Sequence, residues 1–272
     1  MLERVIDLFR AGDVAVLTGA GVSTESGIPD YRGPGTLKRA RTPIRFADYM
    51  ATHANRARYW ARSMVGWERF SQAQPNAAHR ALAELEASGV LAGLITQNVD
   101  RLHHRAGHQS LVELHGALAE ARCLSCGSFE SRASIQLRLL RDNPQLHARY
   151  DALAPDGDAA LPDEAIDGFI IPTCEHCGGV LKPNVVFFGE NVPKERVERS
   201  YGIVDRARTL LVVGSSLTVF SGLRFVRRAK ERGMQVAIIN LGQTRGDNLA
   251  DVRVEATAGT ALQTIKNALS LH

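Results

Sequence analysis

Short apolar runs alternate along the chain with stretches whose apolar residues recur every three or four positions. The runs are bounded by Gly, Asn or charged residues and are typical of buried strands: Val14–Leu17, Leu91–Thr96, Leu111–Leu114, Val185–Phe188, Leu210–Val213 and Val236–Ile239. The main helical patterns are at Ala77–Ser88, Val192–Ala207 and Gly222–Arg232, and residues 1–10 are amphipathic as well. Short strands alternating with amphipathic helices predict an α/β fold with a doubly wound, mostly parallel sheet.

Two regions interrupt this alternation. Residues 42–74 show helical patterns rich in Arg and aromatic residues, and residues 119–180 contain all the cysteines and a stretch typical of a loop at 154–158. We therefore expect a large domain built from residues 1–41, 75–118 and 181–272, a helical insertion at 42–74, and a smaller module at 119–180.

Every cysteine falls into one of two Cys-x-x-Cys pairs, Cys123 with Cys126 and Cys174 with Cys177, and a glycine follows each pair. Each such turn directs two thiolates at one point, and two turns give the closed four-cysteine geometry of structural zinc. The alternatives are a redox pair or two unrelated thiol pairs, but a complete set of four ligands favours zinc. Because no coordination position is left open, we expect the ion to be structural.

The composition narrows the classes of partner. The 272 residues carry a formal net charge of +4, and the Lys and Arg residues are scattered apart from a cluster at 38–41. This pattern does not favour nucleic acid, and no apolar stretch approaches the ~18 residues of a membrane helix. The N-terminus lacks a signal-peptide core. We therefore expect a cytoplasmic monomer that binds neither nucleic acid nor membranes.

The most informative stretch is Thr18–Arg32, which follows the first predicted strand. Gly19 and Gly21 let the backbone approach a ligand, and a helix beginning there would point its N–H groups at a pyrophosphate. The spacing differs from the dinucleotide-binding fingerprint, because Thr24 stands where a third glycine belongs. The polar and aromatic run Ile28-Pro29-Asp30-Tyr31-Arg32 then replaces an ordinary crossover helix. We expect a loop that binds a nucleotide and also acts on it.

Amide and carboxylate groups follow the second predicted strand, at the edge of a parallel sheet where ligands bind. They belong to Gln97, Asn98 and Asp100, and they suit ribose hydroxyls or a positioned water; the alternative role of Asn98 and Asp100 is helix capping. His115 follows the third predicted strand. A histidine at that place can act as a general base, and the alternative is a satisfied core histidine.

Small polar residues end two further strands. Gly214-Ser215-Ser216 suits phosphate contact, with a plain helix N-cap as the alternative. Asn240-Leu241-Gly242 follows Val236–Ile239, and Asn240 can bind ribose hydroxyls where dehydrogenases use Asp or Glu. All of these strand ends are expected to face one crevice.

Together these motifs resemble the sirtuin family over nearly the whole chain. The matching segments are Gly-Ala-Gly-x-Ser with Gly-Ile-Pro-Asp-Tyr-Arg (19–32), Thr-Gln-Asn-Val-Asp (96–100), His-Gly (115–116), the four cysteines, Lys-Pro-Asn-Val-Val-Phe-Phe-Gly-Glu (182–190) and Gly-Ser-Ser (214–216). Other segments, among them Arg58-Tyr59-Trp60-Ala61-Arg62 and Asn240-Leu241-Gly242-Gln243-Thr244-Arg245, are similar to the class II branch of that family.

The resemblance implies a large Rossmann-like NAD-binding domain and a small zinc module, with substrate in the cleft between them. It implies NAD-dependent removal of an acyl group from protein lysine: the substrate carbonyl oxygen attacks the anomeric carbon of the nicotinamide ribose, nicotinamide leaves, and O-acyl-ADP-ribose forms. His115 would be the general base through the ribose hydroxyls, Asn98 would orient water and ribose, and Asp100 would hold nicotinamide or ribose. The implied NAD-binding residues are Gly19, Ala20, Gly21, Ser23, Ile28, Asp30, Tyr31, Arg32, Gln97, Asn98, Val99, Asp100, Gly214, Ser215, Ser216, Asn240, Leu241, Gly242 and Ala258.

The acylated peptide is expected to add as a strand between Phe188-Gly189-Glu190 and Leu217-Thr218-Val219, with affinity supplied by main-chain bonds. Tyr59 and Arg62 share one face of a helix. They resemble the pair with which desuccinylase-type sirtuins hold an acyl carboxylate, which predicts a preference for acidic or long acyl groups. The alternative is that Arg62 is a solvated helix residue. The chain departs from the desuccinylase class at Asp30-Tyr31, where that class usually has Thr-Phe.

Two other functions could use the same NAD site. ADP-ribosyl transfer to a protein side chain shares the first chemical step, and a non-catalytic NAD sensor shares only the binding. The presence of His115 argues against a pure sensor, because binding alone needs no base. A hydride-transferring dehydrogenase is disfavoured, because the third glycine and the acidic ribose anchor are both missing.

Overall fold

The structure is a computed structural model that describes residues 1–31, 43–146, 157–159, 161–162 and 166–269. The predicted site residue Arg32, the basic cluster at 38–41 and residues 154–156 lie outside this part of the chain. The longest helix in the described residues is far too polar to cross a bilayer.

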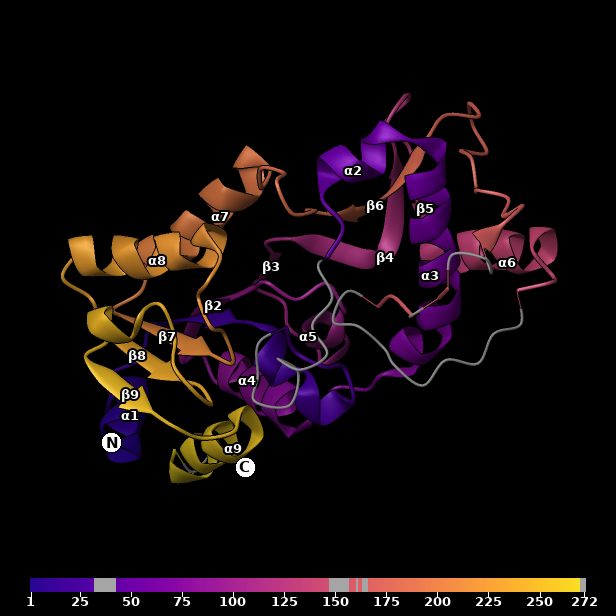
Figure 1. The fold of residues 1–272 in the computed structure, drawn as a ribbon. Helices are drawn as coiled ribbons and strands as arrows, with labels where there is room; N and C mark the ends of the chain where they lie inside the picture. Colours follow the sequence, from indigo (N-terminus) through magenta and orange to yellow (C-terminus); the bar gives the residue numbers. More distant parts are fainter. Residues whose placement is uncertain (32–42, 147–156, 160, 163–165, 270–272) are drawn as a thin grey trace.

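A six-stranded sheet forms the larger half of the molecule (Figure 1). Its strands are β1 (Val14–Thr18), β2 (Leu91–Thr96), β3 (Leu111–Glu113), β7 (Thr209–Val213), β8 (Gln235–Ile239) and β9 (Val252–Val254). They lie in the order β3-β2-β1-β7-β8-β9, and every neighbouring pair is parallel. The direction of winding reverses between β1 and β7, so a ligand crevice is expected at the carboxyl ends of these two strands. The predicted doubly wound parallel sheet is confirmed.

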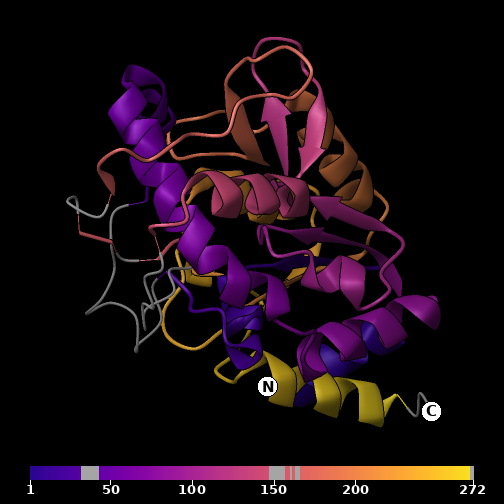
Figure 2. The same ribbon diagram turned by 90° about the vertical axis from the view of Figure 1, so that its right-hand side faces the viewer.

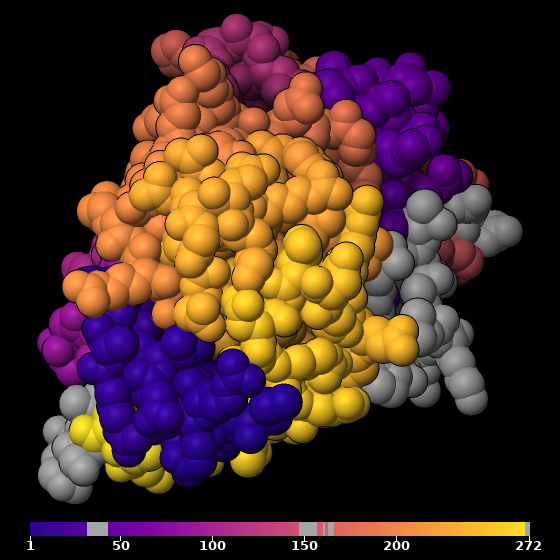
Figure 3. Space-filling view, turned by 90° about the vertical axis from the view of Figure 1, so that its left-hand side faces the viewer, coloured from indigo at the N-terminus to yellow at the C-terminus, as the bar shows by residue number. Residues whose placement is uncertain are grey.

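Helices cover both faces of this sheet (Figure 1). On one face lie α1 (Leu2–Arg10), α4 (Ala77–Ala87) and α9 (Ala258–Ala268), packed against Val14 and Val16. On the other lie α7 (Lys194–Asp205) and α8 (Phe220–Glu231), packed against Ala15 and Leu17. Because successive side chains of β1 enter opposite cores, all five of its residues are buried and the sequence shows a continuous apolar run. Figure 3 shows the N-terminal residues, in indigo, beside the yellow C-terminal segment, where α1 packs on α9 and β9.

A second sheet is antiparallel, with β4 (Gly116–Cys123) between β5 (Phe129–Ser131) and β6 (Leu181–Val185). The helices α2 (Phe46–Ala51), α3 (His53–Gln72) and α6 (Arg132–Asp142) surround it, as Figure 2 shows for α3 and α6. One apolar core joins Trp60 of α3, Ile135 of α6 and Leu181 of β6. The predicted helical segment and the cysteine-bearing segment therefore share a core with each other.

One strand prediction is wrong. The run Val185–Phe188 was expected to be a buried strand of the parallel sheet, but the strand there is β6, which shares only Val185 with the run and lies in the small antiparallel sheet. Past β6 the Val186 N–H still donates to the carbonyl of His115 next to β4, and the Phe187 N–H then donates to the side chain of Glu190. β6 was not recognised in the sequence because its middle residues, Lys182-Pro183-Asn184, interrupt the apolar pattern expected of a buried strand.

Candidate active site and metal centre

A cleft of about 1010 Å³ opens at the carboxyl ends of the central strands and is walled on its other side by the segment after β6. Tyr59 of α3 also reaches its wall. Most of the residues predicted from the sequence line it, namely Gly19, Ala20, Gly21, Ser23, Ile28, Asp30, Tyr31, Tyr59, Gln97, Asn98, Val99, Asp100, His115, Phe188, Gly189, Glu190, Gly214, Ser215, Ser216, Val219, Asn240, Leu241 and Gly242. Residues from distant parts of the chain thus meet at the point where the sheet reverses its winding.

Two predicted residues do not line the cleft. Ala258 is the first residue of α9 and is buried there. Arg62 lies on α3 one turn after Tyr59, and its carbonyl accepts a hydrogen bond of 3.1 Å from the Ala159 N–H. The chain passes close to α3 at this point, since a Cβ on Gly66 would lie 1.9 Å from the carbonyl oxygen of Gly157. The roles assigned to Ala258 and Arg62 remain predictions.

The loop after β1 differs from a dinucleotide fingerprint for a structural reason. Two short 3₁₀ turns, η1 (Ala20–Val22) and η2 (Thr24–Ser26), follow the strand in place of a crossover α-helix. The third glycine of the fingerprint serves close packing between strand and helix, and no α-helix begins here to need it. Thr24 instead donates its hydroxyl hydrogen to the carbonyl of Gly21 at 3.0 Å. The departure seen in the sequence therefore marks a different loop rather than a damaged motif.

Gly19 and Gly21 pack against the loop that follows β7. The Gly21 N–H donates to the Gly214 carbonyl at 2.8 Å. A Cβ on Gly19 would lie 2.7 Å from the Cβ of Ser215, and one on Gly21 would lie 2.9 Å from the Cα of Gly214. Real Cβ atoms do not come so close, so both positions require glycine. We call this contact between residues 19–21 and 214–215 the glycine seam.

Ser23, Asn98 and Asp100 form a hydrogen-bonded group inside the cleft. The Ser23 hydroxyl donates to Asp100 Oδ2 at 2.6 Å and accepts from Asn98 Nδ2 at 3.0 Å. Burial raises the pKa of Asp100, while the hydrogen bond from Ser23 acts in the opposite direction. The other carboxylate oxygen, Oδ1, accepts from the N–H of Leu102, the first residue of α5 (Leu102–Arg105). Asp100 therefore also serves the capping role that the sequence left open.

His115 is held by both ring nitrogens. Nδ1 lies 2.9 Å from the main-chain carbonyl of Gln97, and Nε2 lies 2.9 Å from the hydroxyl of Ser221. Burial, with a smaller contribution from the charges of Arg196 and Arg224, lowers the pKa of His115 to about 4. The imidazole is thus neutral near pH 7, which is the state a general base needs. The side chain of Gln97 points elsewhere and donates to Ser215 Oγ at 2.7 Å.

The two segments predicted to hold the peptide both line this cleft. In the first segment, the Phe188 carbonyl accepts from the Phe46 N–H at 3.0 Å, and the Phe188 ring contacts Tyr31 edge to face. The Glu190 carboxylate already has two partners within the protein: it accepts a hydrogen bond from the Phe187 N–H and forms an ion pair with Lys182 at 3.0 Å. Glu190 therefore shapes this segment through its side chain.

The Cys123, Cys126, Cys174 and Cys177 thiols form a compact cluster whose Sγ atoms all lie within 4.8 Å of one another. None is in a disulfide. The Sγ atoms are 3.5 Å apart for Cys123 and Cys177 and 3.8 Å apart for Cys126 and Cys174. Sulfurs at ~2.3 Å from a tetrahedral zinc ion lie about 3.8 Å from one another. The donor set and its spacing fit a closed structural zinc site, as predicted.

The backbone around the cluster explains the glycine that follows each pair. Gly127 and Gly178 have φ values of 78° and 70°, a region that favours glycine. The Gly127 N–H donates to the Cys123 carbonyl at 3.0 Å, and the Gly178 N–H donates to the Cys174 carbonyl at 2.8 Å. Each pair therefore sits on a tight turn that directs its two thiols to one side.

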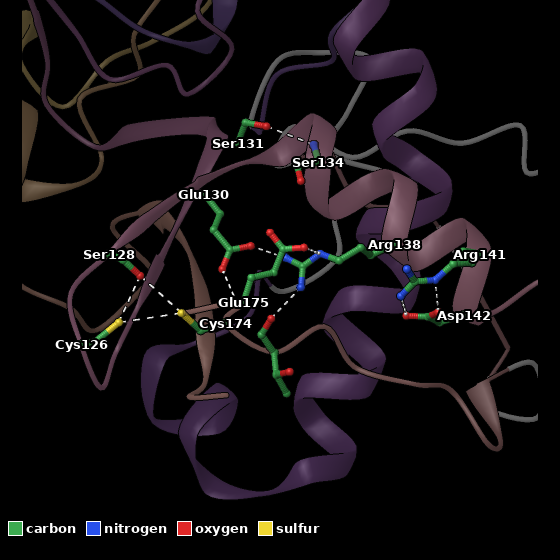
Figure 4. Close-up of polar contacts among 11 residues, drawn as sticks. Cys126, Ser128, Glu130, Ser131, Ser134, Arg138, Arg141, Asp142, Cys174 and Glu175 are labelled. Atoms are coloured by element: carbon green, nitrogen blue, oxygen red, sulfur yellow. Dashed lines mark hydrogen bonds and ion pairs between the residues drawn. The ribbon is translucent and has the colours of Figure 1, made fainter. Parts of the chain in front are cut away.

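Arg138 of α6 ties the second cysteine turn to the small sheet (Figure 4). Its guanidinium pairs with Glu130 of β5 and donates to the Thr173 carbonyl at 2.7 Å. Glu130 in turn accepts from the Glu175 N–H at 3.0 Å. The metal centre lies well away from the cleft, and none of its four thiols is among the residues that line the cleft. This separation agrees with a structural role.

Sequence reasoning missed one polar residue at the heart of the site. Ser221, in the first turn of α8, lines the cleft and contacts His115. Its partner is 106 positions away in the sequence. A serine near the start of a helix is usually a cap, so the pattern carries no signal for a contact with a distant histidine.

The fold and the cleft define a nucleotide-binding α/β protein with a separate zinc module. The Sir2 family model matches residues 19–221, and the chain belongs to the Sir2 family. It is 52% identical over 271 residues to NAD-dependent protein deacetylase 1 of Streptomyces coelicolor, covering 100% of this chain and 91% of the relative. It is 54% identical over 248 residues to the NAD-dependent protein deacetylase of Xanthomonas campestris, covering 91% and 84%.

Solved structures give the same result for the fold. A Sir2 structure with a p53 peptide and NAD+ matches with a TM-score of 0.78 and 29% identity, covering 100% of both chains. A Sir2 structure bound to a propionylated peptide matches with a TM-score of 0.78 and 28% identity, covering 100% of this chain and 99% of the other.

Proposed function

We propose that this protein is an NAD-dependent protein lysine deacylase that cleaves NAD to nicotinamide and transfers the acyl group to ADP-ribose. The observation that carries the proposal is a neutral, partly buried His115 that lines the same cleft as Asn98 and Asp100. The glycine-containing loops of the cleft can bind a dinucleotide, and His115 can take a proton from one of its hydroxyl groups. Relatives at 52% and 54% identity carry the name NAD-dependent protein deacetylase.

The roles of the polar groups follow from their contacts. We assign the phosphates of NAD to the loops on either side of the glycine seam, where N–H groups and the Ser215 and Ser216 hydroxyls lie. We assign the orientation of the nicotinamide ribose to Asn98, which bonds to Ser23, and the acceptance of a hydrogen bond from a ribose hydroxyl or from nicotinamide to Asp100. His115 then removes the proton from a ribose hydroxyl, and its low pKa keeps it ready to do so.

The zinc ion belongs to the four cysteines and supplies no chemistry in the cleft. When bound, it cross-links two turns of the small module and so stabilises the lobe that forms the far wall of the cleft. We propose that the acylated peptide lies between residues 188–190 and 217–219, and that the acyl chain extends toward Tyr59. Tyr59 packs against the rings of Tyr49 and Phe187 at centroid distances of 5.5 and 5.4 Å, which makes this wall aromatic.

A preference for acidic acyl groups through Arg62 remains a prediction. A panel of acetyl, succinyl, methylglutaryl, lipoyl and long-chain acyl groups on one lysine peptide tests it, in the wild-type chain and in Arg62→Met. A preference for carboxylated acyl groups that disappears in Arg62→Met supports the prediction. Equal profiles for the two proteins contradict it.

The central test of the function is product analysis with His115→Ala. We expect the wild-type protein to form nicotinamide, deacylated peptide and O-acyl-ADP-ribose in equal amounts, and His115→Ala to lose deacylation by at least ~100-fold. His104→Ala is the matched control, because His104 is exposed and lies outside the cleft. Modified protein without O-acyl-ADP-ribose would show ADP-ribosyl transfer instead, and NAD binding without turnover would show a sensor.

We further propose that the protein works as a cytoplasmic monomer. Light scattering coupled to size-exclusion chromatography measures the mass in solution directly. A dimer at micromolar concentration would contradict the proposal.

A further inference from the structure

The lone pair on Nε2 of His115 already accepts a hydrogen bond within the protein. A carbonyl oxygen can only accept a hydrogen bond, so Nδ1 of His115 carries the hydrogen that bonds to the Gln97 carbonyl at 2.9 Å. In the neutral ring, Nε2 is then the acceptor. Its neighbour at 2.9 Å is the Ser221 hydroxyl, which must therefore donate to it. The one basic atom of the ring faces a serine hydroxyl before any substrate arrives.

Ser221 is held in this position by close packing of α8 against the loop after β2. A Cβ on Gly222 would lie 2.6 Å from Oε1 of Gln97, so the first turn of α8 packs directly against the Gln97 side chain. The same residue, Gln97, supplies the carbonyl that fixes the His115 ring. Gln97 thus contacts α8 through its side chain, next to Ser221, and the His115 ring through its main-chain carbonyl.

The Ser221 hydroxyl has no structural task that competes with this contact. The N-cap of α8 is Val219, and no side chain caps the helix. Within the described part of the chain, the hydrogen bond to His115 is the contact that the Ser221 hydroxyl makes. Both side chains line the cleft, so a ligand hydroxyl entering from the cleft can meet Ser221 Oγ.

We propose that Ser221 is a catalytic residue that relays a proton from the substrate ribose hydroxyl to His115, a role that rests on the proposed deacylase function. The ribose O–H bond breaks and its proton forms a new bond to Ser221 Oγ. At the same time the original Ser221 O–H bond breaks and its proton forms a bond to His115 Nε2. The electron pair left on the ribose oxygen attacks the acyl-derived carbon, so Ser221 ends as it began and His115 carries the added proton.

The charges around His115 keep the ring neutral, with Nε2 free of a proton, until the transfer takes place. Arg196 and Arg224 both act on the ring from neighbouring helices, and together with burial they favour its neutral form. After the transfer, the imidazolium formed next to two guanidinium groups is poorly stabilised. It therefore returns its proton readily, which resets the relay for the next turnover.

The test compares Ser221→Ala and Ser221→Thr with the wild-type protein, and Thr264→Ala serves as a control that removes an exposed hydroxyl from α9. We measure saturated acyl removal, KM for NAD and peptide, exchange of labelled nicotinamide into NAD, and the rate across H₂O/D₂O mixtures. We expect Ser221→Ala to lose about 100-fold in acyl removal, the scale of general acid–base catalysis. We expect unchanged KM values, retained nicotinamide exchange, and recovery of most activity in Ser221→Thr.

The isotope measurement separates a relay from a structural role. Two protons move in the relay, so the wild-type rate should depend on the D₂O fraction along a curve, and Ser221→Ala should give a straight line. Wild-type acyl removal in Ser221→Ala would overturn the relay, since Ser221 would then only cover the base until substrate displaces it. Loss of nicotinamide exchange along with acyl removal would also overturn it. A wild-type protein that releases no nicotinamide would instead refute the proposed function itself.

Discussion

Replacing Ser23 by alanine tests the electrostatics of the cleft most directly. Ser23 is 1% exposed, and its hydroxyl joins Asp100 at 2.6 Å to Asn98 at 3.0 Å. The substitution removes a donor from the partly buried Asp100 carboxylate and an acceptor from the buried Asn98 amide. A hydrogen bond to a charged group contributes ~1.5–3 kcal/mol and a neutral one ~0.5–1.5 kcal/mol. We therefore expect Ser23→Ala to reduce the free energy of unfolding by about 3 kcal/mol.

For a chain of this size, that loss corresponds to a drop in Tm of roughly 6–12 °C, at about 2–4 °C per kcal/mol. Thermal melts followed by circular dichroism measure it. Thr24→Ala is the matched control, because it removes the exposed neighbouring hydroxyl that bonds to the Gly21 carbonyl. We expect the control to change stability by less than about 0.5 kcal/mol.

The cost of Ser23→Ala should also depend on pH, with a defined sign. The hydrogen bond from Ser23 favours the ionised form of Asp100, so the variant raises the pKa of Asp100 further above its usual value. The stability difference is therefore fully present above that raised pKa, and it shrinks as the pH falls through it and the carboxyl becomes protonated. An equal loss of Tm at every pH, or a variant indistinguishable from Thr24→Ala, would refute the reasoning.

Three further predictions concern the base, the metal centre and a helix. Because the pKa of His115 is lowered to about 4, single-turnover acyl removal should show its acid limb near pH 4; a limb at the ordinary histidine value of ~6.5 would contradict this. Cys126→Ser should lose bound zinc and lower the melting temperature together with activity, measured by metal analysis and circular dichroism, whereas lost activity with unchanged melting would show a catalytic metal. Gly202→Ala should stabilise α7 by ~0.5–1 kcal/mol in urea unfolding, because the nearest atom to an added Cβ is 3.7 Å away; destabilisation would show hidden crowding.

The centre of the parallel sheet was predictable because its strands are buried on both faces, whereas the half-exposed edge strand β9 was not predicted. All five residues of β1 and all five of β7 are buried, so each strand appears in the sequence as an unbroken apolar run. The strands of the small sheet carry no such signal. β5 has no fully buried residue, and β4 mixes alanines with Glu120 and Arg122, so neither was predicted. The register of these strands depends on contacts across the small module.

The site was predictable where chemistry follows directly from a strand end, as at Asn98 and His115. It was not predictable where packing in three dimensions decides the contact. Ser221 reaches His115, 106 positions away, where α8 packs against Gln97, and no local pattern records that approach. The acyl-binding role of Arg62 stays a prediction, since Tyr59 lines the cleft and Arg62 is not among its lining residues.

The glycine seam joins the two halves of the cleft to which we assign different molecules, NAD and the acylated peptide. Gly21 is bonded through its N–H to the carbonyl of Gly214, and the proposed peptide segment begins three residues later at Leu217. A dinucleotide that immobilises the first loop therefore also restrains the start of the second. The entropy lost in ordering that backbone is then lost once rather than twice. By thermodynamic reciprocity, each of the two substrates should bind more tightly in the presence of the other.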